Sequence, residues 1–115
     1  LLHSFRYAFA GVAHALRTQR NMKTHAAISL VVIVTAVALR ASPTEWAVLF
    51  VTIGLVWQSE LMNTALEAVV DKASPELHPL ARVAKDCAAG AVVISAITAV
   101  CVGTVIFGPK LLALL

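Results

Sequence analysis

An apolar stretch of the sequence is interrupted by polar side chains in SELMNTALEAVVDK. The polar members that recur at intervals of three and four residues are Glu60, Asn63, Glu67 and Asp71. On a helix that turns 100° per residue, all four fall on one face. One carboxylate can orient or deprotonate a hydroxyl, and another can hold a divalent cation together with phosphate oxygens. The spacing therefore predicts a helix face suited to phosphoryl transfer from a soluble nucleotide to an alcohol.

The composition places this face in a membrane protein. Of the 115 residues, 60% are hydrophobic and 13% are charged, against about 45–50% and about 25% in soluble domains. Residues 87–109 contain no Asp, Glu, Lys or Arg, and this run can cross a hydrocarbon core of about 30 Å as a helix. Shorter runs without these residues cover 24–39 and 46–59. Three buried helices of a soluble bundle are the alternative, but they should each expose a charged stripe.

The elements that position the polar face are all expected to be helices. Residues of about 1–17 alternate apolar and basic groups with helical spacing, which predicts an amphipathic helix on the inner membrane surface. Three membrane-spanning helices are expected over about 22–41, 44–71 and 81–108. Since no repeat or linker separates them, residues 1–115 form one all-α domain.

The distribution of Lys and Arg predicts the orientation of these helices. Seven of the nine basic residues lie before the first span or between the second and third spans. The two on the other side are Arg40 and Lys110. This asymmetry fits the positive-inside rule with the N-terminus in the cytoplasm and the C-terminus outside. The net charge of +3 is therefore interpreted as topology and not as a site for nucleic acid.

The residues of the polar face are expected to lie at different depths along the second span. With 1.5 Å of rise per residue, Glu60 lies about 24 Å from the outer end of the helix, and Glu67 about 10 Å further toward the cytoplasm. An ionised acid inside a span is unfavourable by about 2.5–3.5 kcal/mol, so such residues usually serve a function. Helix packing alone would explain Asn63 better than the carboxylates.

The inner loop and the start of the third span add further polar groups. They are Glu76, His78, Arg82, Lys85 and Asp86. A lysine beside a Mg²⁺ site would neutralise charge on a phosphoryl group in transfer. Neither a Walker loop nor a kinase-type glycine-rich loop occurs in the sequence, so the composition alone does not identify ATP.

Two segments of the chain carry a resemblance to a known family. ELMNTALEAVVD, followed by PELHPLARVAKD, resembles the signature of the bacterial membrane diacylglycerol kinase family, which includes undecaprenol kinases. The resemblance implies a homotrimer in the bacterial inner membrane, in which each protomer has a surface helix and three membrane helices. It also implies that ATP and Mg²⁺ enter from the cytosol and that neighbouring protomers share each active site.

The same resemblance implies roles for the residues of the polar face. Glu60 matches the catalytic base, and Asn63 matches a residue that lines the nucleotide and acceptor site. Glu67 matches a metal-binding carboxylate, and Asp71 matches a position that supports the site.

Further roles fall outside the polar face. The resemblance implies that Glu76 and His78 belong to a loop that contacts the nucleotide. Lys85 and Asp86 match contacts to the phosphates and the nucleoside, and Tyr7 matches a position near the nucleotide.

One position departs from the family pattern. In TQRNMKTH, Gln19 stands where the family usually has a Glu that shares the metal with Glu67. Glutamine keeps a carbonyl oxygen but lacks the charge of the carboxylate. We therefore expect weaker Mg²⁺ binding and slower turnover.

The acceptor lipid is the least determined part of this hypothesis. NMKTH and FGPK are more similar to the undecaprenol kinase branch, with diacylglycerol as the alternative acceptor. A small proton-coupled transporter would also use one intramembrane Glu, but it would not need the pair Lys85 and Asp86. A non-catalytic membrane scaffold would tolerate Ala at Glu60.

Overall fold

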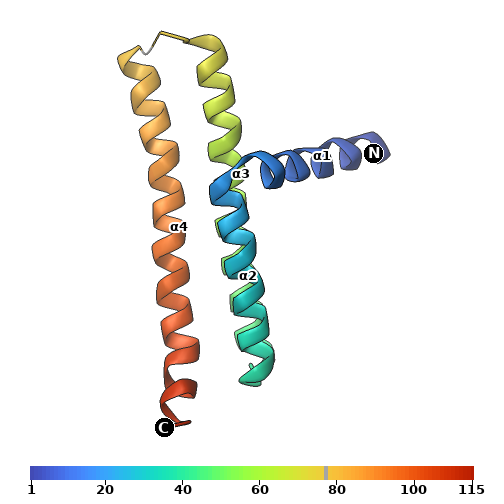
Figure 1. The fold of residues 1–115 in the computed structure, drawn as a ribbon, viewed down its shortest axis with the longest axis vertical. Coiled ribbons are helices and arrows are strands. Elements are labelled where there is room, and N and C mark those ends of the chain that lie inside the picture. The colour runs from blue at the N-terminus through green and yellow to red at the C-terminus, as the bar shows by residue number, and fades with distance from the viewer. Residues whose placement is uncertain (77) are drawn as a thin grey trace.

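The computed structural model describes residues 1–76 and 78–115, and within these residues the chain is all-helical (Figure 1). Helix α3 and helix α4 form a long antiparallel hairpin, α2 lies along α3, and α1 projects sideways from α2 and α3 (Figure 1). The all-α class expected from the sequence is confirmed. The bounds of the helices are α1 Leu2–Thr18, α2 Arg20–Ala38, α3 Pro43–Ala73 and α4 Pro79–Leu112.

A single non-helical residue joins the sideways helix to the bundle. Gln19 has extended backbone angles, φ −106° and ψ 119°, and it is both the last cap of α1 and the first cap of α2. Its amide donates to the carbonyl of Ala15, and its carbonyl accepts from the amide of Lys23. One residue therefore turns the chain from the direction of α1 into that of α2.

Helix α3 begins in the way that its sequence predicts. The Ser42 hydroxyl accepts from the amide of Glu45 at 3.2 Å, and the Glu45 carboxylate accepts from the amide of Ser42 at 2.8 Å. Pro43 occupies the first helical position, where the missing amide hydrogen is no loss. This reciprocal capping box satisfies amides that a helix start would otherwise leave unpaired.

Helix α2 ends in a Schellman motif with an unusual residue at its centre. The amide of Ala41 donates to the carbonyl of Ala36 at 2.9 Å, and the amide of Arg40 donates to the carbonyl of Val37 at 3.2 Å. Arg40 has φ 54°, a left-handed conformation that glycine normally supplies at this position. An L-residue is disfavoured there by about 1–2 kcal/mol. The turn between α2 and α3 is thus well bonded but strained at one residue.

An apolar cluster lies at the same end of the bundle. Ala36 of α2, Leu49 of α3 and Ile106 of α4 are buried together. The partly buried side chains packed around them are Val32, Ala41, Trp46, Val102 and Phe107. Contacts from three helices meet here, and an ion pair of 3.1 Å between Lys110 and Glu45 adds a further link between α4 and α3.

Hydroxyl groups along the helices are satisfied locally. Nine Ser and Thr hydroxyls donate to the carbonyl four residues earlier in their own helix. Such bonds need no water, so these side chains can lie in apolar surroundings.

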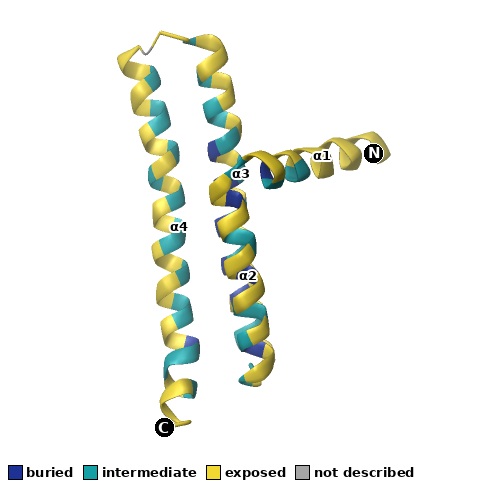
Figure 2. Cartoon of the chain, in the orientation of Figure 1, coloured by how far each residue is buried: buried dark blue, intermediate teal, exposed yellow. Residues whose placement is uncertain are grey.

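Most large apolar side chains are exposed on the outside of the chain (Figure 2), as expected where lipid or a second protein chain covers them.

Among the described helices, two are long and apolar enough to cross a membrane. The most apolar 18-residue window has a mean hydropathy of 1.4 in α2 and of 2.3 in α4. Helix α3 is not one of the two, because the polar residues in its second half, Glu60 to Asp71, lower its hydropathy. The all-helical fold and the two apolar helices are consistent with a membrane protein, whereas α3 as a third span stays a prediction.

Helix lengths place the hairpin beyond the level of α1. At 1.5 Å per residue, α2 is about 28 Å long, α3 about 46 Å and α4 about 51 Å. The ends of α3 and α4 that meet at the connecting loop therefore extend past the start of α2, and Figure 1 shows α1 leaving the bundle well below that loop. The inner half of α3 spans the level at which the sideways helix joins.

Candidate active site

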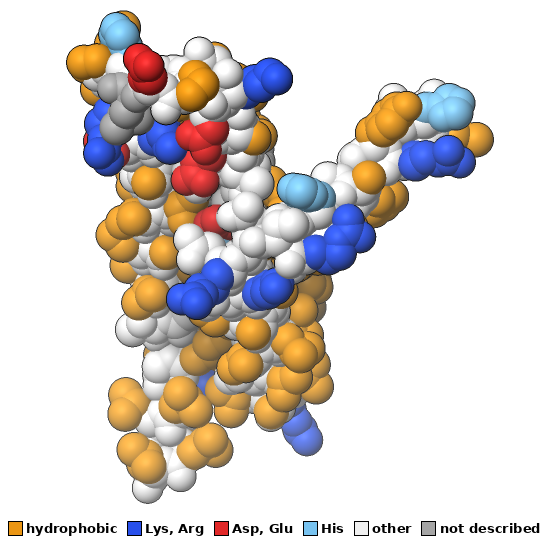
Figure 3. Space-filling model, turned by 45° about the horizontal axis from the view of Figure 1, so that its top comes forward, with side chains coloured by type: hydrophobic (Ala, Val, Ile, Leu, Met, Phe, Trp, Pro, Cys, Tyr) orange, Lys and Arg blue, Asp and Glu red, His pale blue; other side chains and the backbone are white. Residues whose placement is uncertain are grey.

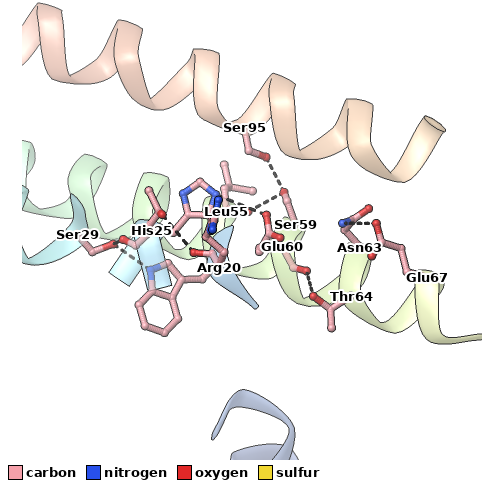
Figure 4. A network of polar contacts seen from close by, with 12 residues as sticks. Arg20, His25, Ser29, Leu55, Ser59, Glu60, Asn63, Thr64, Glu67 and Ser95 are labelled. Carbon is pink, nitrogen blue, oxygen red and sulfur yellow. Dashed lines mark hydrogen bonds and ion pairs between the residues drawn. The ribbon is translucent and has the colours of Figure 1, made fainter. Parts of the chain in front are cut away.

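The centre of the site is a buried carboxylate on α3. The Glu60 side chain is 2% exposed, and its Oε2 lies 3.5 Å from Nε2 of His25 on α2. Within the described residues, this oxygen has no hydrogen-bond partner. The Glu60 backbone carbonyl accepts from the Thr64 hydroxyl one turn further along (Figure 4). An acidic oxygen is therefore held inside the helix bundle with unused hydrogen-bonding capacity.

Asn63 continues the polar face toward the connecting loop. Its Nδ2 donates to Oε1 of Glu67 at 3.3 Å (Figure 4). Its own Oδ1 is buried and, in the described part of the chain, unpaired. Exposure increases stepwise along the face, from the buried Glu60 and Asn63 to the half-buried Glu67 and the exposed Asp71. The face thus leads from the bundle interior to solvent, as the spacing predicts.

The last member of the face connects α3 to α4. Asp71 Oδ1 accepts from Nζ of Lys85 at 2.8 Å. The Lys85 side chain is 31% exposed, so the ammonium group lies at the surface beside the carboxylate. The structure brings together two residues that the sequence separates by the whole inner loop.

The loop residues take local structural positions. His78 caps α4, since its Nδ1 accepts from the amide of Leu80 at 3.0 Å. The backbone carbonyl of Glu76 accepts from the Ser74 hydroxyl at 2.5 Å. The side chains of Glu76, His78 and Asp86 are exposed. Acidic and basic side chains gather at this end of the hairpin (Figure 3).

Two of the predicted site residues lie elsewhere. Gln19 sits at the joint between α1 and α2, and its side chain is half-buried. Because His25 lies beside Glu60 in this antiparallel pair, the position of Gln19 falls near the level of Glu67 along α3. Tyr7 is 73% exposed and lies about 18 Å along α1 from Gln19. A single chain does not bring Tyr7 to the carboxylates.

The donor set for a metal ion is incomplete without a ligand from outside the chain. Among the described residues, no three His, Cys, Asp or Glu side chains gather closely enough to hold a metal. Glu67 uses one oxygen to bind Asn63, which leaves the other available. A carboxylate and an amide oxygen are suitable ligands for Mg²⁺, which usually takes one or two carboxylates together with substrate phosphates and water.

His25 contacts Glu60 but is not among the residues that the sequence predicts for the site. Its spacing to Ser29, four residues on, places both polar groups on one face of an otherwise apolar helix. The same face of α2 makes a second polar contact, because Nε1 of Trp57 donates to the Ser29 hydroxyl at 2.9 Å. A polar pair at this spacing in an apolar run was the available signal, but it does not reveal which helix it meets.

Fold and site together define an all-helical membrane protein with a carboxylate buried between its helices. The sequence model of the prokaryotic diacylglycerol kinase family matches residues 6–107. The chain therefore belongs to this family, a family of membrane lipid kinases.

Individual relatives agree with the family. A diacylglycerol kinase of Synechocystis sp. is 50% identical over 116 aligned positions, which cover 100% of this chain and 66% of the relative. An undecaprenol kinase of Bacillus subtilis is 42% identical over 108 positions, covering 94% of this chain and 88% of the relative. A diacylglycerol kinase of Pseudomonas aeruginosa is 34% identical over 91 positions, with 79% and 74% covered. The chain spans about two thirds of the cyanobacterial relative and more of the other two.

Proposed function

We propose that this member of the lipid kinase family transfers the γ-phosphoryl group of ATP to the hydroxyl of undecaprenol. The observation that carries this proposal is the Glu60 carboxylate, which is 2% exposed and lies inside the helix bundle on the polar face of α3. A carboxylate in a membrane-spanning helix can meet the hydroxyl of a membrane-embedded lipid without that hydroxyl leaving the bilayer. The undecaprenol kinase of Bacillus subtilis, 42% identical, supports undecaprenol as the acceptor.

In the proposed reaction, Glu60 acts as the general base. It accepts the proton of the lipid hydroxyl while the hydroxyl oxygen forms a bond to the γ-phosphorus of ATP. The bond between the γ-phosphorus and the bridging oxygen breaks, and ADP leaves with the electron pair. Asn63 uses one Nδ2 hydrogen on Glu67 and would donate the other to a phosphate oxygen, while its Oδ1, unpaired among the described residues, can accept from a hydroxyl or amino group of the nucleotide. These contacts would help to hold the reacting oxygens in line.

The nucleotide enters from the exposed end of the polar face. Glu67 and Gln19 are proposed to hold Mg²⁺, which neutralises charge on the ATP phosphates when it is bound. Lys85 would donate to a phosphate oxygen in addition to Asp71, whose carboxylate keeps the ammonium group in place. Glu76, His78 and Asp86 line the same exposed end and are proposed to contact the nucleotide, together with Tyr7.

We further propose a homotrimer with shared active sites, the N-terminus in the cytoplasm and the C-terminus outside. The exposed position of Tyr7, far from the carboxylates of its own chain, supports a contribution of α1 to a neighbour's site. Mixing Glu60→Gln with Tyr7→Ala should then give mixed trimers more activity than either variant alone, because one protomer supplies Glu60 and its neighbour supplies Tyr7. If mixtures are no more active than the separate variants, each site belongs to one protomer.

The decisive experiment is a competition between acceptors. Purified protein in mixed micelles would be given ATP labelled in the γ-phosphate, Mg²⁺ and equal amounts of undecaprenol and diacylglycerol. We expect label chiefly in undecaprenyl phosphate. Label chiefly in phosphatidate would replace undecaprenol by diacylglycerol, the acceptor that similarity to the 50% identical diacylglycerol kinase of Synechocystis sp. favours. Label in neither lipid would contradict the kinase function.

The transporter hypothesis has no support from the family. It predicts proton-coupled efflux in proteoliposomes without lipid phosphorylation. Measuring efflux of a cationic dye beside the kinase assay separates the two functions, and we expect no efflux above that of empty liposomes.

A further inference from the structure

We infer that His25 is a positioning residue for Glu60. Its Nε2 holds the Glu60 carboxylate through Oε2 and compensates the charge of that carboxylate, which leaves the other oxygen to face the acceptor hydroxyl. The inference rests on the proposed function only for its effect on turnover. The contact between the two side chains stands by itself.

The contact is well placed for this role. His25 lies about 7.5 Å along α2 from the start of that helix, at the depth where Glu60 is buried. The two side chains are 16% and 2% exposed, and Nε2 lies 3.5 Å from Oε2. Among the described residues, His25 is the one basic side chain within ion-pair distance of Glu60. Figure 4 shows the imidazole ring pointing toward the carboxylate from the neighbouring helix.

The surroundings of Glu60 explain why it needs such a partner. A general base must be available as a carboxylate, and an ionised acid within a span is unfavourable by about 2.5–3.5 kcal/mol without a partner. Asn63 donates to Glu67, and the Thr64 hydroxyl is engaged by the Glu60 backbone. His25 is therefore the side chain that can donate a hydrogen bond to Oε2 without being taken from another contact.

A second polar contact joins α2 to α3 one turn away from His25. The Ser29 hydroxyl donates to the carbonyl of His25 at 2.7 Å and accepts from Nε1 of Trp57 at 2.9 Å. Two polar contacts, one turn apart on α2, thus join α2 to α3: His25 to Glu60 and Ser29 to Trp57. The second contact lacks a titratable group and offers a matched control, because breaking it loosens the same helix pair without touching Glu60.

The test compares four variants in the undecaprenol and diacylglycerol assay. We expect His25→Leu to lower kcat by about 10–100-fold, the usual range for residues that orient another functional group, while the KM values for ATP and lipid change less than twofold. In His25→Gln the amide nitrogen takes the place of Nε2, so most of the loss should be recovered. His25→Asn places its amide at the position of Nδ1 and should not recover it. Ser29→Ala should keep kcat near that of the parent.

A second measurement does not depend on kinase activity. Infrared spectra of the parent, of His25→Leu and of Glu60→Gln would be compared in lipid bilayers at neutral pH. We expect a carbonyl band of a neutral carboxylic acid in His25→Leu that is absent from the parent and disappears when Glu60→Gln is added to His25→Leu. If the parent phosphorylates neither lipid but shows this result, the proposed function fails while the pairing of His25 with Glu60 stands.

Three results would overturn the inference. Equal losses of kcat in His25→Leu and Ser29→Ala would show that His25 only packs α2 against α3. An unchanged kcat in His25→Leu would show that Glu60 needs no partner. Identical infrared spectra of the parent and His25→Leu would show that the imidazole does not influence the carboxylate, whatever the activities are.

Discussion

The two ends of the helix bundle treat their polar groups in opposite ways. The end at the α2–α3 turn is called the outer end and the end at the α3–α4 loop the inner end, after the orientation that the positive-inside rule predicts. At the outer end, Glu45 accepts from the Ser42 amide and pairs with Lys110, beside the apolar cluster around Leu49. At the inner end, buried oxygens of Glu60 and Asn63 have no hydrogen-bond partner among the described residues. Buried polar groups normally find partners, so the outer end has the character of a structural joint and the inner end that of a site prepared for ligands.

The roles proposed for the two ends separate stability from function along one helix. Helix α3 carries both ends, with a capping box at its start and the polar face in its second half. Changes at the outer end should alter folding and leave turnover of the folded protein intact. Changes at the inner end should alter turnover or ligand binding and leave folding intact.

The largest expected effect comes from removing the base at the inner end. Glu60→Gln should lower lipid phosphorylation by about 10²–10⁴-fold, the range typical of general base catalysis, because an amide cannot accept the hydroxyl proton. ATP affinity, measured by equilibrium binding of labelled nucleotide, should change less than twofold. Glu45→Gln is the same substitution at the outer end and should leave kcat unchanged. A comparable loss of kcat in both variants would remove the distinction between the ends.

A smaller loss of activity is expected at Glu67, which lies closer to solvent than Glu60. Glu67→Gln should raise the KM for Mg²⁺–ATP by about tenfold, because a charged ligand of the metal is lost, while saturating nucleotide restores part of kcat. The measurement is a steady-state titration of ATP at fixed excess Mg²⁺. If Glu60→Gln and Glu67→Gln weaken ATP binding equally, the polar face is not divided into a catalytic and a metal-binding part.

At Gln19, which departs from the family pattern, a carboxylate is predicted to strengthen Mg²⁺ binding. Gln19→Glu should lower the Mg²⁺ concentration needed for half-maximal activity by about two- to fivefold, because a carboxylate binds Mg²⁺ more strongly than an amide oxygen. Gln19→Ala should raise that concentration, which gives the ranking Glu, Gln, Ala. A Mg²⁺ titration of all three proteins checks the ranking. The same titration curve for all three would show that residue 19 does not contact the metal.

The smallest effect belongs to the strained turn at the outer end. Arg40→Gly should raise the free energy of unfolding by about 0.5–1 kcal/mol, because glycine adopts a φ of 54° without steric penalty but loses more chain entropy on folding. Arg40→Ala keeps the strain and should give no gain. Thermal unfolding in detergent micelles measures both variants, and kcat should stay at the parent value. A gain in Arg40→Ala equal to that in Arg40→Gly would trace the effect to the charge.

Local signals in the sequence predicted much of this arrangement. Ser42, Pro43 and Glu45 are residue types typical of a helix start, and in the structure Ser42 and Glu45 form a capping box with Pro43 at the first helical position. The common face of Glu60, Asn63 and Glu67 follows from helical periodicity alone. These predictions succeed because they depend on neighbours within one or two turns of the same helix.

Contacts between helices were out of reach of such signals. His25 meets Glu60 only because α2 packs antiparallel to α3 in one particular register, and no short-range pattern fixes that register. Asp71 finds Lys85 across the inner loop for the same reason. The polar side chains proposed for catalysis also lower the hydropathy of α3. The same residues therefore indicate a site and weaken the signal for a membrane-spanning helix.

The joint at Gln19 ties a chemical group to the membrane surface. One non-helical residue separates α1, an amphipathic helix expected on that surface, from α2, which enters the apolar layer. Any change that tilts or lifts the surface helix must therefore turn the backbone at this single residue. Bilayer thickness and lateral pressure, which act on the surface helix, would then shift the residue that is proposed to face the metal. The catalytic activity would therefore depend on the physical state of the bilayer.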